Sequence, residues 1–121
     1  MVNRIKIDKK EDYLKVSFFG EIDSLSVLNY RNLLIDEIND CYKAVIFDFN
    51  DVSFIDSSGI GLVLGRYNQV KANHGTMYLM NLNTVAYRLF ELTGIFSLME
   101  YIESEEEIYT KVGKKDDSNG D

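Results

Sequence analysis

Residues 44–49 constrain the fold of this chain most strongly, because they form a nearly continuous apolar run. Such a run is typical of a strand that is covered by protein on both faces of a parallel sheet. On either side of it, residues 25–40 and 58–73 carry apolar side chains at steps of three and four, which predicts two amphipathic helices. Helices that alternate with buried strands predict an α/β fold with right-handed crossovers.

Shorter patterns predict the other elements. Residues 4–8 and 13–19 alternate between apolar and polar side chains and are joined by a short charged link, so we expect an antiparallel hairpin that opens the sheet. Asn50 and Asp51 are expected to turn the chain after the buried strand. Further strands are expected at residues 52–55, 76–80 and 99–102, and further helices at residues 84–94 and 104–112.

Size, charge and cysteine content predict a single cytoplasmic domain. The domain is expected over residues 1–112, with a polar, disordered tail over residues 113–121. The net charge of −7 and the lack of a basic cluster make nucleic acid and membranes poor partners. The longest apolar stretch, residues 60–64, is too short to cross a bilayer. The single Cys41 excludes an internal disulfide, and its place on the first helix stripe predicts a packed thiol.

The chain has too few residues of the right types for hydrolytic catalysis or zinc binding. The only histidine, His74, lies at the far end of the helix that begins near Ser58, roughly 22–24 Å away at 1.5 Å per residue. A proton cannot pass directly between them, which argues against a serine hydrolase. One histidine and one cysteine cannot form a structural zinc site. We therefore predict no catalytic residue and no metal.

Three glycines follow the strand that ends near residue 55. Gly59, Gly61 and Gly65 resemble a dinucleotide-binding G-x-G-x-x-G turn, although the last glycine comes one residue late. Gly61 and Gly65 also share one helical face, where small residues permit close packing. Close packing is the favoured interpretation, and contact with a nucleotide stays open.

Ser57 and Ser58 stand where this helix begins. One serine can cap the helix, which stabilises it by about 1 kcal/mol, and a second serine is not needed for this. A phosphate on the other hydroxyl would meet the positive end of the helix dipole and unpaired amides. It would also add a charge of about −1.5 to −2 beside Asp56, and beside Asp23 if the two strand ends are neighbours. The residues alone allow either a plain cap or a phosphate-operated binding switch.

Five segments of the sequence add a resemblance to a known family. They are GEID at residues 20–23, NDVSFI at 50–55, DSSGIG at 56–61, LGRYNQVK at 64–71 and RLFELTGIF at 88–96. In this order and spacing, over residues 3–112, the chain resembles the STAS-domain anti-sigma factor antagonists, in particular those that act in sporulation. The resemblance implies a mixed sheet with about four helices packed mostly on one face.

The resemblance also implies a function without catalysis or cofactor. In this family the second hydroxyl residue after the aspartate is phosphorylated, which corresponds to Ser58. The unphosphorylated protein binds an anti-sigma factor, a serine kinase with bound nucleotide, and thereby releases the sigma factor. Phosphorylation ends the binding, and a serine phosphatase reverses it. The implied docking surface consists of Asp23, Asp56, Ser57, Gly59 and Ile60, on a protein expected to be a monomer.

Two other functions stay open at this stage. A small nucleotide-binding or nucleotide-hydrolysing protein could use the glycine-rich turn at residues 59–65. A sensory domain of the same fold could bind an apolar ligand in a cavity among Val63, Leu89 and Phe90.

Overall fold

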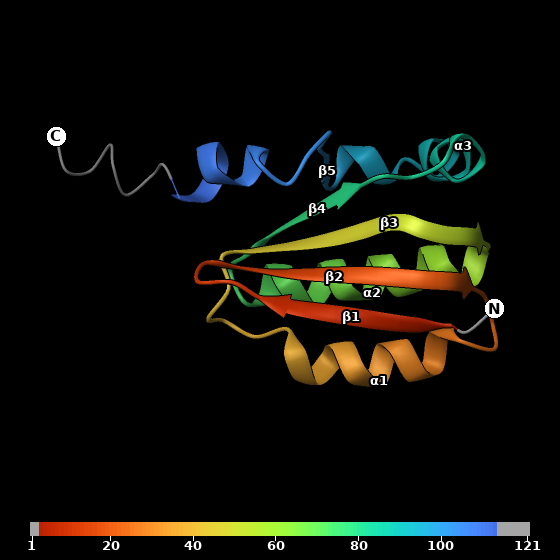
Figure 1. Cartoon of the computed structure of the whole chain (residues 1–121), viewed down its shortest axis with the longest axis horizontal. Helices are drawn as coiled ribbons and strands as arrows, with labels where there is room; N and C mark the ends of the chain where they lie inside the picture. Colours follow the sequence, from red (N-terminus) through yellow and green to blue (C-terminus); the bar gives the residue numbers. More distant parts are fainter. Residues whose placement is uncertain (1–2, 114–121) are drawn as a thin grey trace, which may run out of the picture.

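The apolar run forms the first half of β3 (Ala44–Ile55), the central strand of a five-stranded sheet. The structure is a computed structural model that describes residues 3–113. β3 pairs in parallel with β2 (Tyr13–Ile22) and β4 (Thr76–Met80). β1 (Arg4–Lys9) pairs antiparallel with β2, and the short β5 (Glu100–Tyr101) pairs in parallel with β4 (Figure 1). The expected mixed sheet opened by an antiparallel hairpin is confirmed.

Most of the helical residues cover one face of this sheet. The helices are α1 (Val27–Glu37), α2 (Ser57–Ala72), α3 (Thr84–Thr93), the 3-10 turn η1 (Ile95–Ser97) and the C-terminal η2 (Tyr109–Gly113). Figure 1 shows α2 passing behind the sheet. Side chains of α1, α2 and α3 share the larger of two hydrophobic cores with the strands, so the predicted arrangement of the helices is confirmed.

Phenylalanine rings form the centre of the larger core. The ring of Phe18 from β2 is stacked on Phe49 with centroids 5.4 Å apart, and it meets the edge of Phe47 at 5.0 Å. Phe18 also lies 5.6 Å from Tyr30 of α1, while Phe49 lies 5.8 Å from Phe90 of α3. These pairs have the stacked and edge-to-face arrangements that aromatic rings prefer. Two strands and two helices are therefore joined through one ring cluster.

Two predictions about this framework were wrong. Asn50 and Asp51 do not turn the chain, because β2 continues to pair with β3 beyond them, up to Ile22 and Ile55. The β2–β3 register shifts along this stretch, which lets the strands continue through polar positions. Cys41 is exposed instead of packed, because α1 ends at Glu37 and Cys41 no longer follows the helical stripe. Of the tail predicted at residues 113–121, only Gly113 lies within the described residues.

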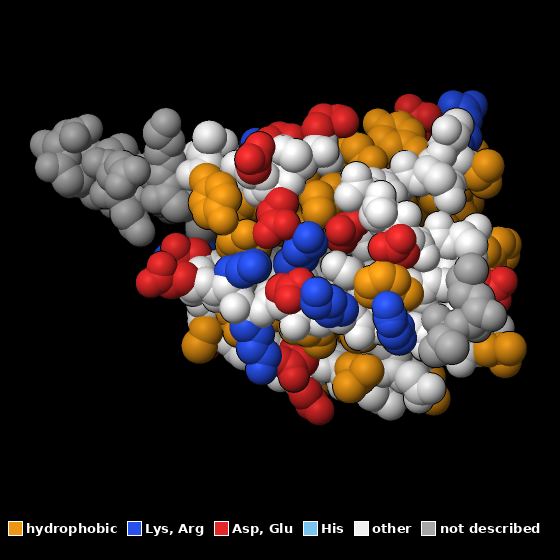
Figure 2. Space-filling model, viewed as in Figure 1, with side chains coloured by type: hydrophobic (Ala, Val, Ile, Leu, Met, Phe, Trp, Pro, Cys, Tyr) orange, Lys and Arg blue, Asp and Glu red, His pale blue; other side chains and the backbone are white. Residues whose placement is uncertain are grey.

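The second face of the sheet combines charged side chains with a smaller core. Lys, Arg, Asp and Glu side chains are interspersed on this side of the molecule (Figure 2). The smaller core contains Ile46 and Tyr78 of the strands together with Ile108 near the C-terminus. The C-terminal segment therefore packs on the face opposite α2.

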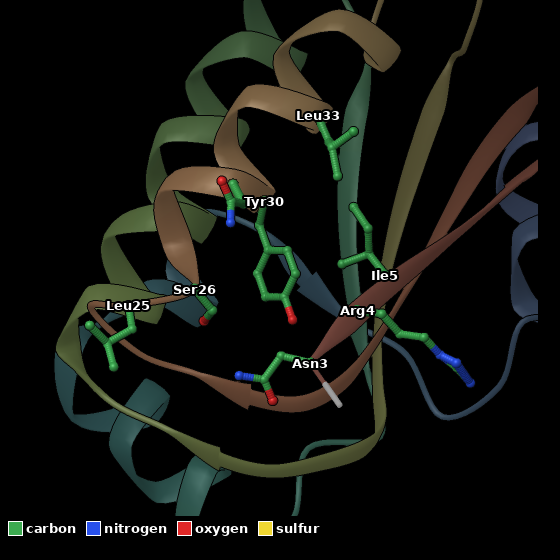
Figure 3. Close-up of a pocket in the computed structure, with 8 residues that line it drawn as sticks. Asn3, Arg4, Ile5, Leu25, Ser26, Tyr30 and Leu33 are labelled. Carbon is green, nitrogen blue, oxygen red and sulfur yellow. The ribbon is translucent and has the colours of Figure 1, made fainter. Parts of the chain in front are cut away.

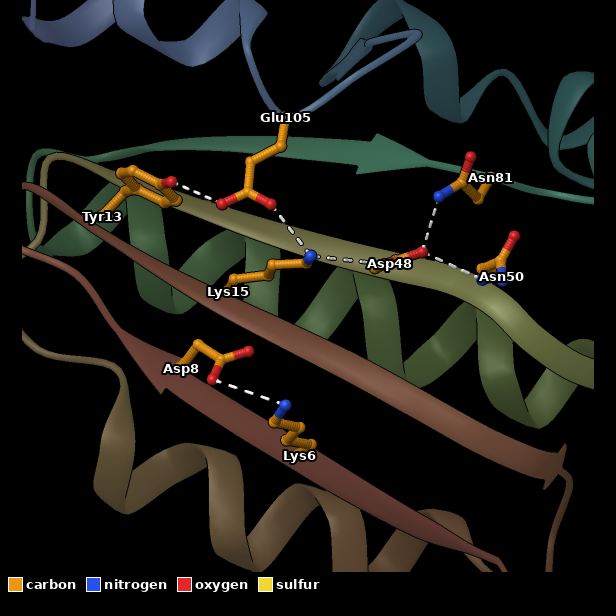
Figure 4. Close-up of polar contacts among 8 residues, drawn as sticks. All are labelled: Lys6, Asp8, Tyr13, Lys15, Asp48, Asn50, Asn81 and Glu105. Atoms are coloured by element: carbon orange, nitrogen blue, oxygen red, sulfur yellow. Dashed lines mark hydrogen bonds and ion pairs between the residues drawn. The ribbon is translucent and has the colours of Figure 1, made fainter.

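A polar network ties this C-terminal segment to the strands (Figure 4). Glu105 accepts hydrogen bonds from the Tyr13 hydroxyl at 2.5 Å and from Lys15 Nζ at 2.9 Å. Lys15 Nζ also lies 3.7 Å from Asp48 Oδ2, and Asp48 Oδ1 accepts a hydrogen bond from Asn81. Burial alone would raise the pKa of Glu105, but the hydrogen bonds from Tyr13 and Lys15 and the charge of Lys15 outweigh it and lower that pKa.

This network predicts a pH-dependent effect of the Glu105→Gln substitution. Because the folded-state pKa lies below 4.5, the carboxylate stabilises the fold at neutral pH, and this contribution disappears as the pH falls through the folded pKa. We expect Glu105→Gln to lower the free energy of unfolding by about 1–2 kcal/mol at pH 7 and by much less near pH 3. Urea unfolding across this pH range measures it, with the exposed Glu106→Gln as control. An equal loss at both pH values would contradict the prediction.

Candidate functional site

The serines singled out from the sequence lie at the carboxyl end of the sheet, where β2 and β3 stop together. Ile22 and Ile55 are paired neighbours, so Asp23 and Asp56, which follow them, leave the sheet side by side. The Asp56 amide donates a hydrogen bond of 3.2 Å to the Ile22 carbonyl, which joins the two strand ends. The condition stated for Asp23, that the strand ends be neighbours, is met.

The cap of α2 is Asp56, and neither serine fills that role. Asp56 Oδ1 accepts hydrogen bonds from the amides of Ser58 at 2.8 Å and Gly59 at 3.4 Å. The interpretation of a serine cap was therefore wrong, because a carboxylate one residue earlier already satisfies these amides. It also follows that these two amides are engaged and do not point freely at a phosphate.

Both serine hydroxyls are left for other roles. Ser57 is exposed and Ser58 is half-buried. Within residues 3–113, the Ser58 hydroxyl makes no hydrogen bond, although its own amide is held by Asp56. A fixed backbone with a free hydroxyl is a suitable arrangement for a residue that is to be modified.

Asp23 is held as firmly as Asp56. Its Oδ1 accepts hydrogen bonds from the amides of Leu25 at 3.0 Å and Ser26 at 3.1 Å. The Ser26 hydroxyl in turn donates to the Glu21 carbonyl, which closes the turn between β2 and α1. Two half-buried carboxylates with fixed positions therefore flank the start of α2.

The other two residues of the expected docking surface lie beneath this corner. Gly59 is buried, and a Cβ atom there would lie 2.4 Å from Ile55 Cγ1 and 3.0 Å from Ile22 Cγ2. Ile60 is only 7% exposed and belongs to the larger core. Gly59 and Ile60 therefore support the corner from within, while Asp23, Asp56 and Ser57 lie at its surface.

The glycine pattern has a different role from either of its two interpretations. Residues 59–65 lie inside α2, so they form no phosphate-binding loop. A Cβ atom at Gly61 or Gly65 would meet nothing within 4 Å, so the two glycines face open space and no element packs closely against them. They instead line a groove between α1 and α2. Val63 and Phe90, suggested to line an apolar cavity together with Leu89, are buried in the larger core, and Leu89 packs against it.

Exposed apolar side chains lie on the elements around the carboxyl end of the sheet, and sequence reasoning missed them. Leu25, just before α1, is 87% exposed, and Leu28 in its first turn is 60% exposed. Phe54 is 49% exposed near the end of β3, and Val85 is 81% exposed in α3. Such a group of apolar side chains is typical of a surface that binds another protein. The helical stripe leaves Leu25 and Leu28 off the buried face. The patterns around Phe54 and Val85 gave no signal of exposure, because they assign apolar residues to the core.

Two pockets of similar size open beside this surface. One of about 400 Å³ lies between β1 and α1, where the Tyr30 hydroxyl points toward Asn3 and Arg4 (Figure 3). The other, of about 420 Å³, lies between the end of β3 and the start of α3 and includes Phe54 and Val85. The carboxyl end of the sheet is thus an uneven, partly apolar surface.

The chain is similar to a known protein family over almost its whole described length. A family model described as the STAS domain matches residues 4–114. This chain belongs to the STAS domain family. Over 102 residues the STAS domain is 29% identical to the anti-sigma-B factor antagonist of Bacillus subtilis (strain 168), which covers 79% of this chain and 87% of the relative. It is 26% identical over 111 residues to the anti-sigma F factor antagonist of Paenibacillus polymyxa, covering 90% and 94% of the two chains.

Solved structures agree with this assignment. The anti-sigma factor antagonist SpoIIAA in its unphosphorylated form superimposes with a TM-score of 0.75 at 28% identity, over 91% of this STAS domain and 97% of that chain. The Bacillus cell fate determinant SpoIIAA in the phosphorylated form gives a TM-score of 0.70 at 29% identity, over 90% and 99% of the two chains. The similarity extends over almost the whole length of each protein.

The described part of the STAS domain was also searched for features of hydrolases, metal sites and membrane spans. His74 has a φ of 64° and lies beyond the C-terminal end of α2, far from Ser58. Among the residues that the structure describes, no group of three or more His, Cys, Asp or Glu side chains is placed to hold a metal ion. Within the same residues, no helix is long and apolar enough to span a bilayer.

Proposed function

We propose that this protein is an anti-sigma factor antagonist controlled by phosphorylation of Ser58. In its unphosphorylated form it binds an anti-sigma factor, a serine kinase with bound nucleotide, and so releases a sporulation sigma factor. Phosphorylation of Ser58 ends this binding, and a serine phosphatase restores it. The protein acts in the cytoplasm as a monomer, without a cofactor and without catalysis of its own.

One observation carries this proposal: the Ser58 hydroxyl has no hydrogen bond within residues 3–113, at a corner framed by two fixed carboxylates.

In the kinase reaction, the γ-phosphoryl group of ATP is transferred to Ser58 Oγ. A bond forms between the γ-phosphorus and Oγ, the bond to the oxygen that bridges to the β-phosphate breaks, the hydroxyl proton goes to a base of the kinase, and ADP leaves.

The proposed docking surface combines Asp23, Asp56 and Ser57 with exposed apolar neighbours such as Leu25 and Phe54. Gly59 and Ile60 contribute by holding the start of α2 against the strands. The phosphate adds a charge of about −1.5 to −2 next to two carboxylates and in the middle of a contact area. Like-charge repulsion and desolvation of the phosphate then weaken binding.

Phosphate mapping tests the assignment of Ser58. The protein is incubated with ATP and a purified anti-sigma factor kinase from the same genome, and the phosphate is located by mass spectrometry. We expect one phosphate on Ser58, no labelling of Ser58→Ala, and normal labelling of Ser57→Ala. Equal labelling of Ser58→Ala and the unaltered protein would refute the assignment. Phosphorylated protein should bind the kinase at least about tenfold more weakly, as measured by calorimetry.

A further inference from the structure

Arg66, in the middle of α2, is a buried cation that has no partner in the part of the chain that the structure describes. It is 7% exposed, and its Nε and Nη1 atoms make no hydrogen bond within residues 3–113. No carboxylate among these residues forms an ion pair with Arg66 or with Arg31 of α1. Burial lowers the pKa of Arg66, and the nearby charge of Arg31 lowers it further. Buried guanidinium groups are usually paired, because removing a charge from water is costly.

Both arginines line the groove between α1 and α2, which has a volume of about 350 Å³. Ser58, Gly61 and Gly65 lie on the same face of α2 and line the groove as well. Because a Cβ atom at either glycine would meet nothing within 4 Å, the two glycines keep the groove open along the helix. Among the residues that the structure describes, no Asp or Glu side chain lines it. The groove therefore has two cations, one hydroxyl and room for a small anion.

The surroundings of Ser58 direct a phosphate toward this groove. On one side, the carboxylates of Asp23 and Asp56 repel it. The amides of Ser58 and Gly59, which could otherwise hold it, are bonded to Asp56. On the other side, Arg66 follows Ser58 by two helical turns, about 12 Å, and helical side chains incline toward the N-terminus. Guanidinium groups bind phosphate oxygens through pairs of parallel hydrogen bonds.

We propose that the α1–α2 groove receives the phosphate of phosphorylated Ser58, where Arg31 and Arg66 bind it. This inference rests on the proposed function, because it assumes that Ser58 carries a phosphate. The phosphate then joins α1 to α2 through ionic contacts and comes to lie beside the exposed Leu28. The modified state is held within the domain itself, in addition to its repulsion of the partner.

The test places phosphoserine at residue 58 of the full chain during translation, by an expanded genetic code, so that no kinase is needed. A ³¹P NMR titration measures the second pKa of the phosphate, which is about 6 for free phosphoserine. We expect the arginines to lower it by about one unit. Phosphoserine at residue 57, which is exposed and does not line the groove, is the matched control and should titrate near 6.

Arginine variants decide whether the groove causes this shift. Arg31→Gln and Arg66→Gln should each move the pKa of phosphoserine 58 back toward 6, whereas Arg66→Lys should keep part of the shift. Arg31 is exposed, so its variant keeps the inference testable if Arg66→Gln does not fold. Equal pKa values for phosphoserine at 57 and 58, or a shift that survives Arg31→Gln and Arg66→Gln, would overturn the inference. Failure of the kinase to label Ser58 would instead overturn the proposed function and leave this titration unaffected.

Discussion

Replacing Phe18 with alanine is expected to lower the free energy of unfolding by about 3–5 kcal/mol. The ring is 1% exposed and contacts Tyr30, Phe47 and Phe49, so the substitution leaves a cavity between β2, β3 and α1. The loss combines the transfer free energy of the ring with the cost of the cavity. Urea unfolding followed by circular dichroism measures the effect.

The neighbouring residue provides the control. Phe19 points to the opposite face of the sheet, is only half-buried, and lies under the guanidinium of Arg4 at 4.1 Å from the ring centre. Phe19→Ala should therefore cost about 1 kcal/mol or less. Similar losses for the two variants would show that the ring cluster around Phe18 is not the centre of the core.

Gly59→Ala is expected to lower the free energy of unfolding by about 1–3 kcal/mol, although alanine is the better helix former. The new Cβ atom would lie 2.4 Å from Cγ1 and 2.8 Å from Cδ1 of Ile55, which is itself buried. To relieve this steric clash, the start of α2 must move away from β3, and Ser58 moves with it. Thermal unfolding of the unphosphorylated protein measures the loss.

Gly61→Ala and Gly65→Ala are the matched controls in the same helix. A Cβ atom at either position meets open space, so the higher helix propensity of alanine should raise stability by about 0.5–1 kcal/mol. The expected effects of the three substitutions thus differ in sign. Stabilisation by Gly59→Ala would contradict the packing of α2 on Ile22 and Ile55.

The order of helices and strands was predictable because their apolar residues follow different patterns along the sequence. The apolar run at residues 44–49 and the helical stripes on either side required helices and parallel strands in alternation. The length of β3 was not predictable, since its polar second half is stabilised by hydrogen bonds to β2, a partner more than 30 residues away. The exposure of Cys41 depends on where α1 ends, and helix ends are weakly encoded.

The candidate site was predictable in part. The hydroxyls and carboxylates near Ser58 follow from their positions at the ends of adjacent strands. The cap was assigned to the wrong residue, because serine and aspartate are equally good caps and only the structure shows which one bonds the amides. The juxtaposition of Arg31 and Arg66 depends on how α1 packs against α2, and the contacts of Glu105 with Tyr13 and Lys15 join segments about 90 residues apart. No local pattern contains this information.

The division of β3 into two halves has a consequence for evolution. Its first six residues are buried, and β4 pairs only within this half, whereas Asn50, Asp51, Ser53 and Phe54 of the second half are exposed. The second half leads directly to the serines at the start of α2. Substitutions at these exposed positions change the surface of the strand that leads to Ser58, with little cost to the core. Duplicated copies of such a gene can therefore acquire separate partners while they keep the same fold, so that parallel regulatory circuits remain insulated from one another.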